Sequence, residues 1–100
     1  MSEPIKPEDA PRLHAERIPP QVVEIFNELI AKNWNGRYAF VMQEDAVQLI
    51  VARMKVERRK IFDEGWLDVE YLFGTKGWKV EYDKPAYNES YDPRFTFQKA

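Results

Sequence analysis

The chain has 100 residues, the length of one domain, and 44% of them are hydrophobic, so a small core can form. It contains no cysteine, which excludes disulfides and thiolate chemistry, and its formal net charge of -2 argues against a protein whose main role is to grip a phosphate backbone. No apolar run approaches the length of a membrane span and nothing resembles a signal peptide, so we expect no membrane partner and a cytoplasmic location.

The first 18 residues are predicted to form a flexible, proline-rich tail. Pro4, Pro7 and Pro11 are spread through a charged segment whose few apolar residues show no period, so little surface could be buried to offset ordering. His14, the only histidine, lies in this segment, where we expect neither a metal site nor a general base. A single small domain is predicted over residues 19–100.

The clearest predicted helix covers residues 20–34. Pro19 and Pro20 suit its first turn, and apolar residues follow at helical spacing at Val22, Val23, Phe26, Leu29 and Ile30. The next segment, RYAFVM (37–42), is aromatic and β-branched, which is typical of a short strand or of an extended link. As a strand, it would add a third member to a C-terminal hairpin.

Three further helical segments are predicted between residues 44 and 73. The first, 44–53, has one apolar stripe that includes Val47 and Ile50, and the second, 57–64, would bury Ile61 and Phe62 and end at Gly65. No glycine or proline divides these two segments, so one continuous helix is an alternative.

The third segment, 66–73, is predicted as a helix of about two turns capped by Asp68. Its inward-facing residues would be Leu67, Tyr71 and Leu72, and two glycines end it before Trp78.

Residues 77–98 predict a β-hairpin with one aromatic face. Trp78, Val80 and Tyr82 alternate with charged residues, and Phe95 and Phe97 repeat the pattern. The connection between the two runs is rich in turn formers and too long for a two-residue turn. Because an isolated hairpin is marginal in water, its aromatic face must pack on the helices, with Tyr82 in the core.

The predicted fold class is therefore α+β, with three to four short helices packed on a C-terminal β-hairpin. The element order is that of a winged helix-turn-helix, in which the third helix enters a major groove and the hairpin is the wing. The extra short helix between Phe62 and Trp78 departs from that pattern.

Two segments, GWKVEYDKPAYNESYDPRFTF (77–97) and IFDEGWLDVE (61–70), resemble segments of small accessory proteins of large tailed bacteriophages. The resemblance is limited to residues 61–97. It implies a small phage-type cytoplasmic protein and assigns no catalytic residue.

A basic stretch is the first candidate site. Its members are Arg53, Lys55, Arg58, Arg59 and Lys60. Such residues contact phosphates or base edges in nucleic-acid-binding proteins. The alternative is a solvated helix face, which the acidic residues that follow from 63 to 70 and the overall acidity favour.

Two tyrosines between the predicted strands, Tyr87 and Tyr91, are the second candidate site. Tyrosine is favoured at protein interfaces, so these rings predict a protein-contact surface. The alternative is that both rings fold the loop back onto Tyr82.

Enzyme chemistry is not expected. The sequence has no glycine-rich phosphate loop, no nucleophile motif and no metal-ligand spacing, and we expect no cofactor. The function predicted is a protein-interaction adaptor or inhibitor, and the alternative is a winged-helix-like nucleic-acid-binding protein.

Overall fold

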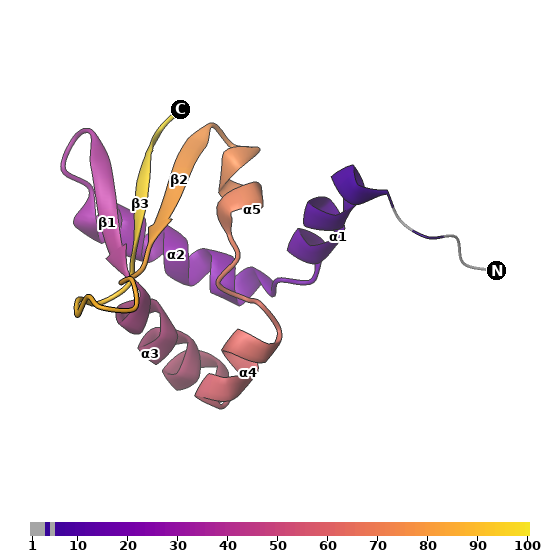
Figure 1. Ribbon diagram of the computed structural model, residues 1–100, viewed down its shortest axis with the longest axis horizontal. Helices are drawn as coiled ribbons and strands as arrows, with labels where there is room; N and C mark the ends of the chain where they lie inside the picture. Colours follow the sequence, from indigo (N-terminus) through magenta and orange to yellow (C-terminus); the bar gives the residue numbers. More distant parts are fainter. Residues whose placement is uncertain (1–3, 5) are drawn as a thin grey trace.

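The computed structural model describes Pro4 and residues 6–100 (Figure 1). Its elements in chain order are η1 (Pro7–Asp9), α1 (Ala10–Glu16), α2 (Pro20–Asn33), β1 (Tyr38–Met42), α3 (Gln43–Met54), α4 (Arg58–Asp63), α5 (Glu70–Gly74), β2 (Trp78–Asp83) and β3 (Arg94–Lys99). The strands of this described part form one antiparallel sheet in the order β1-β3-β2. The predicted α+β class is confirmed, and the segment after α2 is a strand rather than a link.

The core lies between α2 and one face of the sheet, and Figure 1 shows α2 passing behind the strands. Phe26 on α2 is fully buried, and its ring centroid lies 5.4 Å from that of Phe95 and 6.1 Å from that of Phe97, both on the central strand β3. Phe73 on α5 completes the cluster at 6.4 Å from Phe26. Inclined rings at these separations attract one another beyond their simple burial.

The start and end of α2 follow from local sequence. Pro19 stands in extended geometry just before the helix, and Pro20 occupies its first position, where no N–H is needed. After Asn33 the chain turns into β1 because the side-chain oxygen of Asn35 accepts hydrogen bonds from the backbone N–H groups of Arg37 and Tyr38, at 3.0 and 2.9 Å.

The predicted second and third helices are separate. Lys55 adopts left-handed geometry, with φ of 54°, and its N–H donates to the carbonyl of Val51, which ends α3. The chain then runs through Val56 and Glu57 and enters α4 at Arg58. The two helices therefore form a helix–turn–helix with a short connection.

The predicted helix over 66–73 is shorter in the structure and begins at Glu70, so Asp68 does not cap it. Trp66, Leu67 and Val69 are instead buried within the turn that precedes α5. That turn is closed by backbone hydrogen bonds, including one from the N–H of Trp66 to the carbonyl of Ile61. Tyr71 faces outward and is exposed, contrary to the prediction.

Two aromatic residues expected in the core are partly exposed. Tyr82 is 40% exposed because it lies near the outer end of β2, an edge strand, and Phe62 on α4 is 45% exposed. The prediction for Tyr82 relied on strand alternation, which assigns a residue to a face without showing how far that face is covered. Phe62 was expected to be buried beside Ile61, but of the two only Ile61 is buried.

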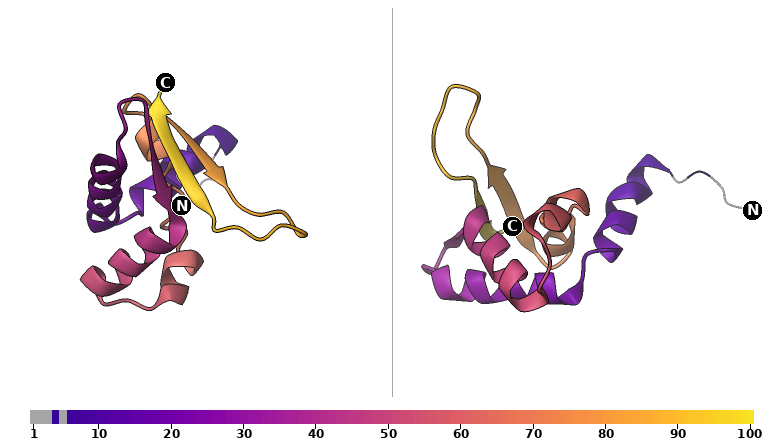
Figure 2. Two further views of the ribbon diagram at one scale, coloured as in Figure 1. Left: turned by 90° about the vertical axis from the view of Figure 1, so that its left-hand side faces the viewer. Right: turned by 90° about the horizontal axis from the view of Figure 1, so that it is seen from below.

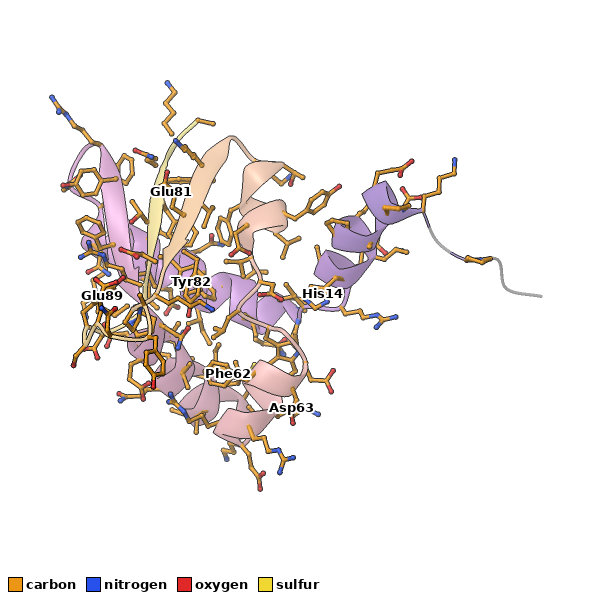
Figure 3. The ribbon with its side chains drawn as sticks, in the orientation of Figure 1. His14, Phe62, Asp63, Glu81, Tyr82 and Glu89 are labelled. Carbon is orange, nitrogen blue, oxygen red and sulfur yellow. The ribbon has the colours of Figure 1, made fainter. Side chains whose placement is uncertain are left out.

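Part of the predicted tail is helical. α1 contacts α5, and Ala15 and Ile18 are buried. His14, labelled in Figure 3, has its Nε2 atom 3.1 Å from the carbonyl oxygen of Gly65 and 3.3 Å from the carboxylate of Asp68. The rest of the predicted tail includes Met1–Glu3 and Ile5, which lie outside the described residues, and the domain boundary at residue 18 stays a prediction.

Candidate functional site

The basic stretch lies on the helix–turn–helix formed by α3 and α4, and three of its members are paired with carboxylates. The guanidinium of Arg53 lies 2.6 Å from the carboxylate of Glu28 on α2. That of Arg58 lies 2.7 Å from Glu44 on α3. Glu28 and Glu44 come from other elements, so these pairs could not be read from the local sequence.

The third pair is exposed and joins Arg59 to Asp63 at 3.3 Å, while Lys60 lies 5.9 Å from the ring centroid of Trp66. Lys55 is exposed in the connection between the two helices. Exposed ion pairs contribute little to stability and can exchange partners. The structure thus brings the basic residues together on one helix pair, with acidic side chains interspersed among them.

The connection between β2 and β3, residues 84–93, forms a loop that projects away from the helices, as both views of Figure 2 show. Tyr87 is fully exposed on this loop, at 107% of its reference area. Backbone and side-chain hydrogen bonds link Ala86 and Glu89, at 3.0 and 3.3 Å. The ring of Tyr87 is therefore presented by a turn with its own hydrogen bonds.

Tyr91 plays a different part in the same loop. Its hydroxyl lies 2.8 Å from the carbonyl oxygen of Lys84 and 3.0 Å from Oδ1 of Asp83, so its proton is shared between two acceptors at the base of the loop. Partial burial and the hydrogen bond to Asp83 raise the pKa of Tyr91 above its usual value. Of the two predicted contact residues, Tyr87 faces solvent and Tyr91 holds the loop.

A small hollow of about 130 Å³ lies between α4, α5 and the end of β2. Phe62 and Tyr82, both labelled in Figure 3, line it together with Asp68 and Glu70. The hydroxyl of Tyr82 donates a hydrogen bond to the side chain of Gln43, and burial followed by the charges of Glu70 and Asp68 raises the pKa of Tyr82. The hollow is smaller than a typical ligand pocket.

A pair of tryptophans forms a second surface feature, which the sequence patterns did not single out. Trp34, just after α2, is 41% exposed, and its ring centroid lies 5.6 Å from that of Trp78 at the start of β2, with the ring planes at 89°. The sequence has one signal for the exposure of Trp34, which stands next to an Asn-Gly turn. A helix ends at such a turn, so fewer neighbouring residues bury the side chains there.

Among the described residues, no group of three or more histidine, aspartate or glutamate side chains is placed to hold a metal ion, and no helix is long and apolar enough to cross a membrane. Comparisons with protein-family models, curated proteins and solved structures give no match to this chain. The candidate surfaces are therefore argued from geometry and chemistry alone.

Proposed function

We propose that this protein is a non-enzymatic interaction module that binds a protein partner through its β2–β3 loop, as an adaptor or as an inhibitor of a larger enzyme. The observation that carries this proposal is the full exposure of Tyr87 on a loop with internal hydrogen bonds. The resemblance to phage accessory proteins makes the bacterial cytoplasm the setting of the proposal.

The ring of Tyr87 is fully exposed in this chain, so its whole surface is available to a partner. Burying a tyrosine removes on the order of 200 Å² from water, and tyrosine is among the residues that dominate interface energetics. The hydrogen bonds of Tyr91 and Glu89 order the loop before binding. A preordered loop loses less conformational entropy when it binds, which favours affinity.

The test places a photo-crosslinking amino acid at position 87 of the full chain in bacterial cells, and a matched one at Tyr71, an exposed tyrosine outside the loop. A protein crosslinked from position 87 and not from position 71 is the expected result. With that protein purified, Tyr87→Ala should weaken binding by roughly tenfold or more, as expected of an interface hot spot, while Tyr71→Ala should not. Equal crosslinking from both positions would contradict the proposal.

A second candidate function is a winged-helix-like nucleic-acid-binding protein. The element order, the helix–turn–helix of α3 and α4 and the sheet order β1-β3-β2 support it, with the β2–β3 loop as the wing. The carboxylate partners of Arg53, Arg58 and Arg59, and the acidic Glu89 and Asp92 on the loop, count against it.

Titration of duplex DNA and single-stranded RNA at low and moderate salt separates the two candidates. Binding that falls steeply with salt would require several phosphate contacts and favour the second candidate. Arg58→Glu together with Arg59→Glu should then abolish it, while Tyr87→Ala should leave it intact. Absence of binding at low salt would reject the second candidate and leave the first to be decided by the crosslinking experiment.

A further inference from the structure

Three adjoining hollows lie around Trp78, at the end of the β2–β3 hairpin opposite to the loop. Their volumes are about 260, 450 and 390 Å³, and Trp78 lines all three. Trp34 lines two of them, so the hollows form one surface, which we call the Trp34–Trp78 groove. Figure 1 shows the elements that form it, with α2 behind the sheet and α5 beside β2.

The groove is mainly apolar. Its walls include Val23, Ile30 and Ala31 from α2 and Leu72 from α5. Trp78 is anchored from below, since its ring lies edge-on to the buried Phe97 at a centroid distance of 6.4 Å. The groove therefore has a fixed floor, with the exposed ring of Trp34 at its margin.

The charged residues that line the groove are lysines. Lys76 lines two of the hollows, and Lys99, the register partner of Trp78, lines one of those two together with Trp34. In a chain with a formal net charge of -2, this is a local basic rim around an apolar floor. Opposite charge on a partner would complement the rim and guide the partner into place.

We propose that the Trp34–Trp78 groove binds a peptide segment of a protein partner that carries an apolar anchor side chain flanked by aspartate or glutamate. The anchor occupies the floor between α2 and α5, and the carboxylates face Lys76 and Lys99. Tryptophans around a well-packed apolar pocket are the typical anchor points of interfaces. This site is independent of the β2–β3 loop.

The same residue types occur where single-stranded nucleic acids bind, because bases stack on tryptophan and lysine contacts phosphate. Two features favour a peptide instead. The indole planes stand at 89° to one another, so they do not offer parallel faces to successive bases. The walls beside Trp78 include the aliphatic side chains of α2 and α5, which match the shape of an apolar side chain.

The groove and the β2–β3 loop lie at opposite ends of the hairpin. Trp78 pairs with Lys99 at one end of the hairpin, and Asp83 pairs with Arg94 at the other end, where the loop begins. Five residue steps along a strand separate the two ends by about 17 Å. One molecule could therefore hold two partners at once, which is the geometry an adaptor requires.

The experiment selects binders for the full chain from a displayed library of random peptides, with the Ala31→Glu variant used for counter-selection. Ala31 is exposed on α2 and lines the groove, so glutamate at this position obstructs the groove and repels an acidic peptide without changing the buried core. The most enriched peptide is then titrated while the indole N–H signals of the three tryptophans are followed by NMR. Oligothymidylate is titrated in parallel.

We expect an enriched peptide with an aromatic or aliphatic residue flanked by acidic residues. It should shift the indole signals of Trp34 and Trp78 and not that of the buried Trp66. The pair Lys76→Glu and Lys99→Glu should weaken its binding by about tenfold or more. The control pair Lys6→Glu and Lys32→Glu makes the same change in net charge outside the groove and should have no such effect.

Three outcomes would overturn the proposal. One is a selection that enriches no peptide over the Ala31→Glu counter-selection. The second is an enriched peptide without acidic residues, or one whose binding both lysine pairs leave unchanged. The third is oligothymidylate that shifts the two indole signals while no peptide does, which would assign the groove to nucleic acid.

Discussion

Two groups of aromatic side chains have opposite surroundings. The first group packs at inclined angles between the sheet and α2 and consists of Phe26, Phe95 and Phe97. The second group, Tyr87 and Tyr91, lies on a loop that projects beyond the helices (Figure 2). The first group is buried and has no polar atom, so its rings can contribute only through packing. The second group has hydroxyls, and that of Tyr91 is used to hold the loop.

The difference shows how one hairpin serves two purposes. On the face toward α2, phenylalanine gives the largest gain from burial and leaves no polar group without a partner. In the loop, tyrosine tolerates water at its hydroxyl while its ring remains available for contact. Substitutions in the two regions should therefore affect different measurements.

The largest expected effect is on stability, from Phe26→Ala. This ring is fully buried and packs on three other phenylalanines, so its removal should leave a cavity and lower the free energy of unfolding by about 3–5 kcal/mol. Urea unfolding monitored by circular dichroism measures the change. Tyr87→Ala is the control, and its effect should stay within about 0.5 kcal/mol. Similar losses from both variants would break the distinction between core and loop.

A smaller and more local effect is expected from Tyr91→Phe. This variant keeps the ring and removes the hydroxyl that joins Asp83 and Lys84, so the loop should lose order while the core is unchanged. Amide hydrogen exchange of residues 84–92 should become several-fold faster, with the rates in α2 unaffected. Thr75→Val is a suitable control, since it removes a hydroxyl that bonds the carbonyl of Leu72 far from the loop. Unchanged exchange in Tyr91→Phe would show that other contacts order the loop.

The sequence predicted the core better than the surfaces, and the reason is physical. Val22, Phe26, Leu29 and Ile30 repeat at helical spacing because they share one buried face, so pattern alone identifies them. The same kind of alternation separates the two faces of the hairpin, with Lys79 and Gln98 register partners on the outer face.

Surface contacts depend on residues that are distant in the chain. Arg53 meets Glu28, and Trp34 meets Trp78, across separations that no local period records. The same limit explains the corrections at Phe62 and Tyr82, because the cover of each ring depends on where a neighbouring element ends. The paired arginines and the Trp34–Trp78 groove could be recognised only once the fold was known.

The smallest expected effect concerns alkaline pH and sharpens the comparison at Tyr82, which lies between the two regions. Burial and the nearby charges of Glu70 and Asp68 raise the pKa of Tyr82 above its ordinary value of 10.0. The folded state therefore holds the phenolic proton more tightly than the unfolded state, so this contribution to stability is fully present below pH 10.0 and is lost as the pH rises through the folded-state value.

Urea unfolding at a series of pH values around and above 10.0 should show that the stability of the parent chain falls, and that the fall is shallower in Tyr82→Phe. The control is Tyr87→Phe, which alters a fully exposed ring and should follow the parent chain. If stability fell with pH equally in the parent chain and in Tyr82→Phe, the hydroxyl of Tyr82 at the end of β2 would be no better shielded from solvent than that of Tyr87 on the loop.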